Sequence, residues 1–334
     1  MQLEASDTQR RMRIGVCGVG SIGSRHARLL SQRGDVDVYV ADPVEQHIRE
    51  AERLPNVAAS SATLDELLDF ELDGLVVATP DRFHVPFAET ACLKGIPVLL
   101  EKPIAEDVSS GEHLKRVITQ TGTKVLVGYP LRHHSGFLKA KEILDEGQIG
   151  VPVSFHIDLG AYETLVVAKN RFSPEDKNKL FIDYSHEWDY LQWFLGRVSR
   201  GIALSSLVGK GEHKQDPNVV DALVEMDSGI SGTAHLDYIR SPGKRAFGIV
   251  GDEGTIALDA SNRSLVVRRY ADGFDQMYAI EETFDSMMSR QLSHFLDVAA
   301  GERQPDVTID DGINALRVAD ALIRSARTGS WESI

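Results

Sequence analysis

The stretch from Arg13 to Leu30, RIGVCGVGSIGSRHARLL, constrains the fold more than any other part of the chain. An apolar run enters a glycine turn, GVGSIG, and a helical pattern leaves it. In such a unit the first glycine allows the tight turn, the second lets a phosphate approach the backbone, and the third lets the helix pack on the strand. The free N–H groups of that helix favour an anion. We therefore expect a dinucleotide to contact Gly18, Gly20, Ser21, Ile22 and Gly23.

An acidic residue at the expected distance supports this interpretation. Asp42 follows the next apolar run and lies about 20 residues beyond the glycine turn, as the motif requires. A carboxylate at this position can accept hydrogen bonds from the ribose hydroxyls of an adenosine, and it would repel a 2′-phosphate. We therefore favour NAD over NADP as the cofactor. The alternative is that Asp42 is only a turn residue before Pro43.

Composition excludes several classes of function. The 334 residues suit two domains, and 42% hydrophobic with 26% charged residues is ordinary for a globular protein. A net charge of −14 argues against nucleic acid or an anionic membrane as a partner. Two cysteines imply no disulfide framework, which favours the cytoplasm, and we expect no spanning helix or secretory signal. The eleven histidines include no HExxH and no CxxC-type pairing, so no metal site is expected.

Apolar strands alternate with helical patterns in the first part of the chain. The expected strands are 13–18, 36–41, 74–78, 97–100 and 124–128, and a short segment at 56–59 is attached to the return of the second strand. The expected helices are 24–33, 44–54, 64–69 with Thr63 as its N-cap, 85–94 and 110–120. This alternation predicts a parallel sheet that helices cover on both faces.

After residue 128 the pattern changes. The expected strands are 151–158, 201–208, 219–226, 230–238, 246–250, 255–258 and 265–269, which predicts a mainly antiparallel sheet. The expected helices are 135–146, 185–195, 286–300 and 310–327. We therefore expect domains at 1–128 and 129–334, with the last helix packed back on the first domain.

Ligands of doubly wound sheets bind beyond the carboxyl ends of the strands, so the residues there are the ones to examine. They include Ala78, Thr79, Pro80, His84, Glu101 and Lys102. Pro103 biases Lys102 towards an extended conformation, so the lysine can project over the edge of the sheet. Lys102 is therefore a candidate catalytic residue, although a lysine at a strand end is usually a solvated surface charge.

A second group of polar residues lies near one expected helix. Asp183, His186, Asp189 and Trp193 are separated by three, three and four residues, which is helical spacing. An imidazole flanked by carboxylates suits a general base near neutral pH. The alternative is that Asp183 or Ser185 caps the helix, Asp189 is a surface acid and His186 is a satisfied core histidine.

Taken together, the chain resembles the Gfo/Idh/MocA family of NAD(P)-dependent sugar and polyol oxidoreductases. The segments that carry the resemblance are GVGSIGSRHARLL, VVATPDRFHVPFAETACLKGIPVLLEKPIA, VGYPLRHHSGF, DYSHEWDYLQWFLG and QLSHFLDVAAGERQPDVTIDDGINALRVADALIRSA. The resemblance implies an α/β fold class: an N-terminal Rossmann domain, a doubly wound parallel sheet, followed by a C-terminal α/β domain. That second domain would have a large, mainly antiparallel open sheet, through which two or four copies of the chain would associate.

The resemblance also implies roles for individual residues. Lys102 would contact the reacting hydroxyl, His186 would accept its proton, and Asp183 is a third catalytic candidate. Family members commonly have an aspartate four residues before the histidine, but here that residue is Ile182. Glu101, Pro103, Thr79 and His84 would line the nicotinamide end, and Ala78, Pro80 and Lys102 are further expected cofactor contacts. The candidate substrate contacts are Lys102, Arg132, Tyr162, Arg171, Asp183, His186 and Asp189.

The expected function is reversible hydride transfer between NAD and a secondary hydroxyl of a sugar, an inositol or a sugar derivative. Two alternatives stay open. One is an enzyme of the same family that retains its NAD and cleaves glycosidic bonds by transient oxidation. The other is a regulatory protein that binds NAD without turning it over; the presence of both Lys102 and His186 argues against it.

Overall fold

A computed structural model of the chain describes residues 10–162, 177–209, 217–271, 273 and 275–334. By their internal contacts they form two compact units. The first unit extends to Gly128 and also includes Met288–Ile309, and the second comprises Tyr129–Met287 and Asp310–Ile334. The domain boundaries expected from the sequence, and the packing of the last helix on the first domain, stay predictions.

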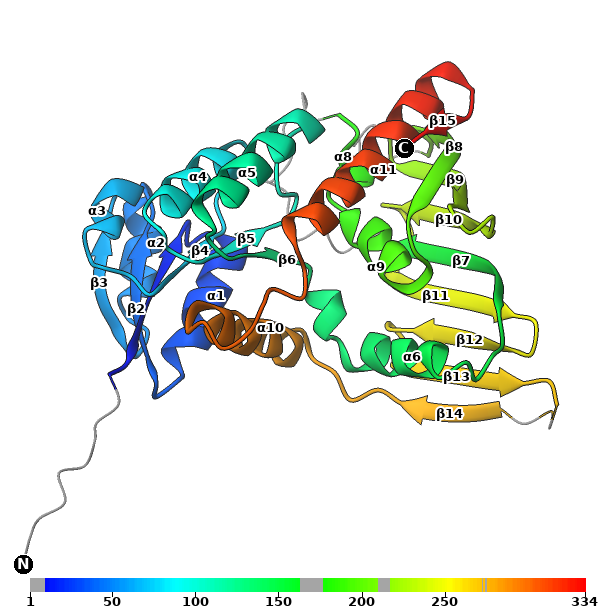
Figure 1. Cartoon of the computed structure of the whole chain (residues 1–334), viewed down its shortest axis with the longest axis horizontal. Coiled ribbons are helices and arrows are strands. Elements are labelled where there is room, and N and C mark those ends of the chain that lie inside the picture. Colours follow the sequence, from blue (N-terminus) through cyan, green and yellow to red (C-terminus); the bar gives the residue numbers. More distant parts are fainter. Residues whose placement is uncertain (1–9, 163–176, 210–216, 272, 274) are drawn as a thin grey trace, which may run out of the picture. The chain divides into compact units, whose positions relative to one another are not determined.

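The first unit contains a six-stranded sheet in the order β3-β2-β1-β4-β5-β6, and all neighbouring strands are parallel. Its strands are β1 (Met12–Cys17), β2 (Val36–Ala41), β3 (Val57–Ser61), β4 (Gly74–Val77), β5 (Val98–Glu101) and β6 (Val125–Gly128). Its helices are α1 (Ser21–Ser31), α2 (Glu45–Ala51), α3 (Leu64–Leu68), η1 (Asp81–Phe83), α4 (His84–Leu93), α5 (Val108–Thr121) and α10 (Phe284–Ala299). Helices α1 and α10 lie on one face of the sheet and α4 and α5 on the other (Figure 1). This arrangement confirms the doubly wound fold.

Local sequence explains where these elements begin. The hydroxyl of Thr63 accepts the N–H of Glu66, and the Glu66 carboxylate accepts the N–H of Thr63, so the expected N-cap of α3 is confirmed as a capping box. Helix α1 begins at Ser21, three residues earlier than expected, because Gly20 is its N-cap. The segment expected at 56–59 is a separate strand, β3, at the edge of the sheet.

Residues from far along the chain complete the first unit. The ring of Phe295 in α10 lies so close to Gly74 that a Cβ there would be 3.0 Å from it. The segment after α10 extends the contact, because the N–H of Val127 in β6 donates to the carbonyl of Val307 over 3.0 Å. Both Phe295 and Val307 are fully buried.

The second unit contains a nine-stranded sheet in the order β14-β13-β12-β11-β7-β10-β9-β8-β15. Its strands are β7 (Pro152–Gly160), β8 (Val198–Ser206), β9 (Val219–Met226), β10 (Ser231–Asp237), β11 (Lys244–Gly251), β12 (Gly254–Asp259), β13 (Ser264–Arg269), β14 (Asp275–Ala279) and β15 (Glu332–Ser333). Strands β7 and β10 are parallel and the other pairs are antiparallel, which confirms the mainly antiparallel sheet. The two edge strands, β14 and β15, are not in the sequence-based prediction.

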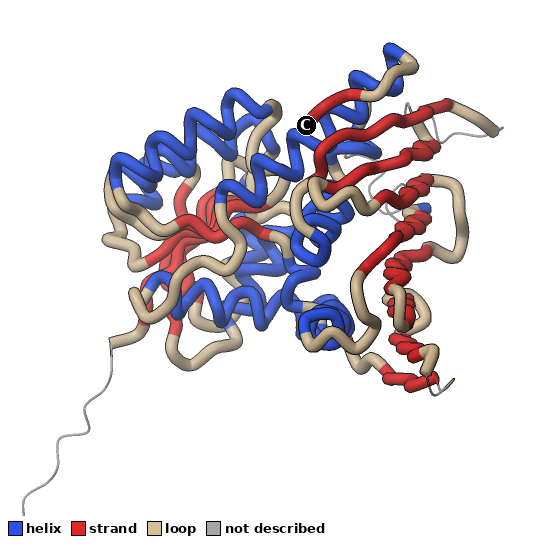
Figure 2. The backbone as a smooth tube through the Cα atoms, turned by 45° about the vertical axis from the view of Figure 1, so that its right-hand side comes forward, coloured by secondary structure: helices blue, strands red, loops and turns tan. Residues whose placement is uncertain are grey.

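Helical elements position the polar residues of this unit. They are η2 (Pro130–His133), α6 (Ser135–Asp145), α8 (Lys179–Ile182), α9 (Ser185–Leu195) and α11 (Ile309–Thr328). Helices α6, α9 and α11 all lie on one face of the nine-stranded sheet (Figure 2). Aromatic rings fill this layer, since Tyr190 and Phe194 of α9 pack on Phe247 of β11 with ring centroids 4.9 and 5.1 Å apart. In the described residues, no helix is both long enough and apolar enough to cross a membrane.

A buried histidine–glutamate hydrogen bond joins α1 to β5 in the first unit. The Nε2 atom of His26 lies 2.8 Å from the Oε1 atom of Glu101, and the two residues are 0% and 9% exposed. Burial raises the pKa of the Glu101 carboxyl, but the hydrogen bond from His26 and the charges of His26 and Lys102 lower it, and the net shift is downward. The pair therefore contributes stability above the ordinary glutamate range, about pH 4.3, and this stability is lost as the pH falls through the lowered pKa.

Replacing His26 by leucine tests this pair. At pH 7 we expect His26→Leu to lower the free energy of unfolding by about 3–5 kcal/mol, because a buried carboxylate loses its partner. The difference from the wild type should shrink towards pH 4, as the carboxyl becomes protonated in the variant first. Urea unfolding of the wild type and the variant at pH 7 and at pH 4 measures this difference in the free energy of unfolding. The matched control is His113→Leu, which breaks a half-exposed histidine–glutamate pair of 3.0 Å, His113–Glu89. Equal losses in both variants would contradict the prediction.

Candidate active site

The glycine turn has the geometry of a phosphate cradle. Gly18 has a φ of +83°, and an added Cβ would lie 2.8 Å from the carbonyl oxygen of Ala78, so only glycine fits there. Gly20 faces open space, with no atom within 4 Å of an added Cβ. At Gly23 a Cβ would lie 1.7 Å from the oxygen of Gly18, which is the close helix–strand approach that the motif requires. No side chain caps the N-terminus of α1, and its first turn carries no acidic residue.

Asp42 is fixed beside this turn. Its side chain is 8% exposed, and its Oδ2 atom accepts the N–H of Val19 over 2.9 Å. The Oδ1 atom accepts the N–H of Val44, the N-cap of α2, over 2.9 Å, and lies 3.1 Å from Nδ1 of His47. The carboxylate therefore joins the turn after β1 to the start of α2, with its orientation set by backbone donors.

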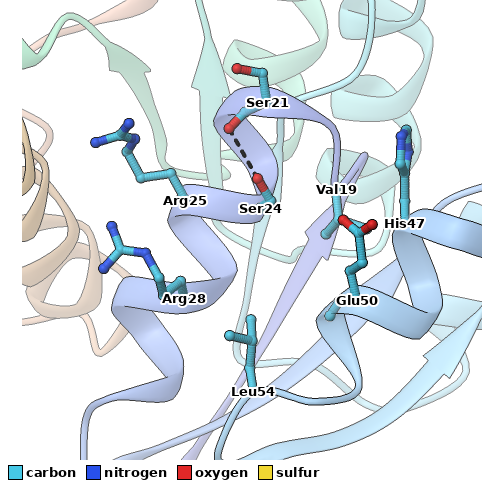
Figure 3. A pocket seen from close by; sticks show the side chains of 9 residues that line it. Val19, Ser21, Ser24, Arg25, Arg28, His47, Glu50 and Leu54 are labelled. Atoms are coloured by element: carbon cyan, nitrogen blue, oxygen red, sulfur yellow. Dashed lines mark hydrogen bonds between the residues drawn. The ribbon is translucent and has the colours of Figure 1, made fainter.

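A cavity of about 280 Å³ lies between α1 and α2 (Figure 3). His47, which contacts Asp42, and Ser21, the first residue of α1, are both in its wall. Figure 3 shows that Arg25 and Arg28 leave α1 on the side away from His47 and Glu50. The other residues of the wall are Val19, Ser24, Ala51 and Leu54.

The ends of β4 and β5 carry the other expected cofactor contacts. After β4, the N–H of Ala78 donates to the carbonyl of Cys17, which holds this loop against β1. Thr79 Oγ1 is buried and has no hydrogen-bond partner among the described residues. After β5, Lys102 is half-buried and is followed by a cis peptide bond to Pro103.

These features fit a bound dinucleotide. The open space at Gly20 and the uncapped end of α1 suit a pyrophosphate, and the buried carboxylate of Asp42 beside the turn suits the hydroxyls of a ribose. The unpartnered hydroxyl of Thr79 is a buried polar group that a ligand would satisfy. All twelve residues expected to bind the cofactor lie in the first unit.

Two candidate substrate contacts of the second unit bind each other. Arg132 in η2 donates from Nε and Nη2 to the two carboxylate oxygens of Asp189 in α9, over 3.1 and 2.6 Å. Its Nη2 atom also lies 3.0 Å from Oδ1 of Asp311, and its guanidinium stands 5.7 Å from the ring centroid of Trp193. Burial lowers the pKa of Arg132, but the charges of Asp189 and Asp311 outweigh it, so the pKa is raised and the group stays a cation.

His186 lies in the first turn of α9 and packs edge-on against Tyr129, with ring centroids 5.5 Å apart. Tyr129 is fully buried, and its pKa is raised by burial and by the charge of Asp189, so it stays a neutral phenol. Asp183 is 9% exposed and lies in the turn between α8 and α9 rather than on α9 itself. Tyr162 is half-buried after β7, and Arg171 lies outside the described residues.

Sequence reasoning missed three residues of these two sites. The sequence pattern places His26 only in the helix after the glycine turn, although its ring is hydrogen-bonded to Glu101. Tyr129 directly follows β6, so the strand-end rule that pointed to Lys102 could have found it. No sequence pattern points to Asp311, because it lies 179 residues from Arg132 and the two residues meet only in the folded chain.

The comparisons with known proteins agree with this geometry. Residues 12–129 match the Gfo/Idh/MocA model described as an oxidoreductase family with an NAD-binding Rossmann fold, and residues 137–257 match the Gfo/Idh/MocA C-terminal domain. The chain is 26% identical over 340 residues to scyllo-inositol 2-dehydrogenase (NAD(+)) of Bacillus subtilis strain 168, covering 96% of each chain. It is 29% identical over 338 residues to inositol 2-dehydrogenase 1 of Saccharopolyspora erythraea, covering 96% and 95%.

Solved structures show the same fold. Myo-inositol 2-dehydrogenase of Lactobacillus plantarum superposes with a TM-score of 0.84 at 21% identity, covering 97% of this chain and 100% of that one. Scyllo-inositol dehydrogenase of Lactobacillus casei, solved with NAD(H) and scyllo-inositol, gives 0.83 at 18% identity, covering 97% and 99%. With both family models matched, and with the glycine turn and Asp42 arranged for a dinucleotide, the chain belongs to the Gfo/Idh/MocA family and is an NAD-dependent oxidoreductase.

Proposed function

We propose that the chain oxidises a secondary hydroxyl of a cyclic polyol of the inositol class, or of a related sugar, with NAD. The observation that carries this proposal is the likeness to scyllo-inositol 2-dehydrogenase (NAD(+)) of Bacillus subtilis, which spans 96% of both chains. A polar, acceptor-rich second unit, with Asp183, His186 and Asp189 around the start of α9, suits a ligand that is mostly hydroxyl groups.

In the proposed mechanism two side chains handle the reacting hydroxyl. The nicotinamide, when bound, supplies the hydride acceptor. Lys102, as an ammonium, orients the hydroxyl and stabilises the negative charge that develops on its oxygen. His186 takes the hydroxyl proton as general base, a contribution typically worth roughly 10²- to 10⁴-fold. Asp183 is proposed as the third catalytic residue.

The remaining candidate contacts are proposed to hold the polyol. They are Arg132, Tyr162, Arg171, Asp183 and Asp189. We infer that Arg132 and Asp189 act as one unit, because the bidentate bond between them fixes both side chains. Removing Arg132 would take the bidentate partner from the buried carboxylate of Asp189, whereas removing Asp189 would leave the Arg132 cation with its contact to Asp311.

We further propose that copies of this chain associate through the nine-stranded sheet, as a homodimer or homotetramer. Leu204 of β8 is 72% exposed and Leu223 of the neighbouring strand β9 is 39% exposed. With Ile202 they line a depression on the sheet, to which Asp221, Thr233 and His235 also contribute. Exposed apolar surface of this kind is typical of an association site. A cytoplasmic location, favoured by the cysteine content, also stays a proposal.

Alanine variants test the two main catalytic assignments. We expect Lys102→Ala and His186→Ala each to lower the rate of NAD reduction by inositols at least about 100-fold, because the proton acceptor or the stabilising charge is lost. Calorimetric titration should show that both variants still bind NAD. The control is Lys139→Ala, at an exposed lysine that contacts Glu142. Wild-type activity in either variant would refute its assignment. Release of NADH in step with polyol oxidation separates this function from NAD-retaining glycoside cleavage and from NAD sensing.

Asp42 decides the choice of cofactor. We expect Asp42→Ala to weaken NAD binding roughly 10- to 100-fold, since hydrogen bonds to a charged group contribute about 1.5–3 kcal/mol. The NADP affinity should fall less or rise, because the repulsion of the 2′-phosphate is removed. Titrations with both dinucleotides measure the ratio, and Asp69→Ala, at an exposed acid, is the control. An unchanged ratio would mean that the carboxylate does not face the ribose.

The association surface is tested by placing charge on it. We expect the double variant Leu204→Glu, Leu223→Glu to sediment as a monomer where the wild type sediments as a dimer or tetramer, because like charges would meet in an apolar contact. Leu93→Glu, at a leucine of α4 that is 68% exposed, should leave the mass unchanged. A monomeric wild type, or an unchanged oligomer in the double variant, would exclude this surface.

A further inference from the structure

His84 makes two hydrogen bonds that a neutral imidazole cannot make together. Its side chain lies at the start of α4 and is 1% exposed. Nδ1 is 2.7 Å from the carbonyl oxygen of Pro103, and Nε2 is 2.8 Å from the carbonyl oxygen of Thr79. We propose that His84 is a doubly protonated imidazolium that ties the loop after β4 to the loop after β5 and thereby positions Lys102.

The protonation state follows from the two acceptors. A carbonyl oxygen has no hydrogen to donate, so each ring nitrogen must donate in order to bond. A neutral ring has one N–H only, and its second nitrogen would then point a lone pair at a carbonyl lone pair inside the protein. Leaving buried polar groups unsatisfied in this way is costly, whereas hydrogen bonds from a cation are among the stronger ones.

The two loops are the ones that the strand-end rule selects. Strands β4 and β5 are parallel neighbours, with Val77 opposite Leu100, so their loops leave the same edge of the sheet. Thr79 is two residues beyond β4, and Pro103 is bonded directly to Lys102. The imidazolium therefore holds the backbone next to Lys102 at a fixed distance from the loop that carries the unpartnered hydroxyl of Thr79.

Charges of both signs lie near His84, so its two carbonyl acceptors are the main support for an imidazolium. Glu101, at the end of β5, interacts electrostatically with His84, with Lys102 and with His26 of α1. Its carboxylate is the negative charge among these groups. Asp81 and Arg82 lie in η1, directly before His84 in the chain. Gly128 of β6 leaves room for the Glu101 carboxylate, since a Cβ there would lie 3.1 Å from it.

The consequence for catalysis rests on the proposed role of Lys102. With both ring nitrogens bonded to backbone carbonyls, His84 acts through Lys102 as a positioning residue, which differs from the direct cofactor contact expected from the resemblance. Misplacing a catalytic group by about 1 Å can lower a rate roughly 10²-fold. Loss of the two hydrogen bonds of His84 should therefore lower the turnover rate more than the cofactor affinity.

The protonation state can be read directly in the intact protein. We would label its histidines with ¹⁵N and record two-bond ¹⁵N–¹H spectra at pH 7.5, with the His84 signals assigned by their absence in His84→Gln. Both ring nitrogens of His84 should show the chemical shifts of N–H groups. One protonated and one bare nitrogen in His84 would overturn the proposal, whatever the enzyme's activity.

Kinetics test the positioning role. The amide of Gln donates from a single nitrogen, so His84→Gln should lower kcat roughly 10- to 100-fold while the NAD dissociation constant changes much less. The matched control, His113→Gln at the half-exposed histidine paired with Glu89, should change neither. An unaltered kcat in a folded His84→Gln protein would overturn the positioning role. A wild type that oxidises no polyol would instead remove the proposed function, and the spectra would still decide the state of His84.

Discussion

The hydrogen bond from the N–H of Val19 to the carboxylate of Asp42 is the contact on which the cofactor site depends. It joins the glycine turn after β1 to the end of β2, and it is buried. The strand order then places β4 and β5 beside β1 on its other side. Four strand ends therefore meet at one edge of the sheet, which lets residues as far apart in sequence as Gly18 and Lys102 belong to one binding surface.

Much of this fold follows from the sequence because its signals are local. The spacing of the glycines, the apolar runs and the Thr63 capping box each act within a few residues. The parallel sheet that they predict is observed, with β3 as an additional edge strand. The two members of the pair His26–Glu101 are 75 residues apart, and those of the pair Arg132–Asp189 are 57 apart. No local sequence pattern therefore predicts either pair. Strand β14 was missed for another reason: its residues are mostly exposed, so it lacks an apolar alternation.

Both units contain the same kind of buried polar pair near their candidate site residues. A buried carboxylate is bound by a basic side chain from another element: Glu101 by His26, Asp189 by Arg132, and Glu187 by Arg245 over 2.8 Å. Such pairs offset the cost of burying charge and add little net stability compared with apolar packing. These pairs matter for the geometry of the site, because each pair fixes the orientation of both of its side chains. Burial of this kind suits residues that must present lone pairs and protons in fixed directions.

The first unit is not contiguous in sequence, and this affects how the chain can be made. Phe295 and Val307 complete its core and its last strand, yet they are synthesised after eight of the nine strands of the second sheet, β7 to β14. During synthesis on the ribosome the first unit is incomplete, and the apolar face around Gly74 is uncovered, until some 300 residues have emerged. Cutting the gene at residue 128 would therefore yield a sheet that lacks part of its own covering layer, and such a fragment should be prone to aggregation.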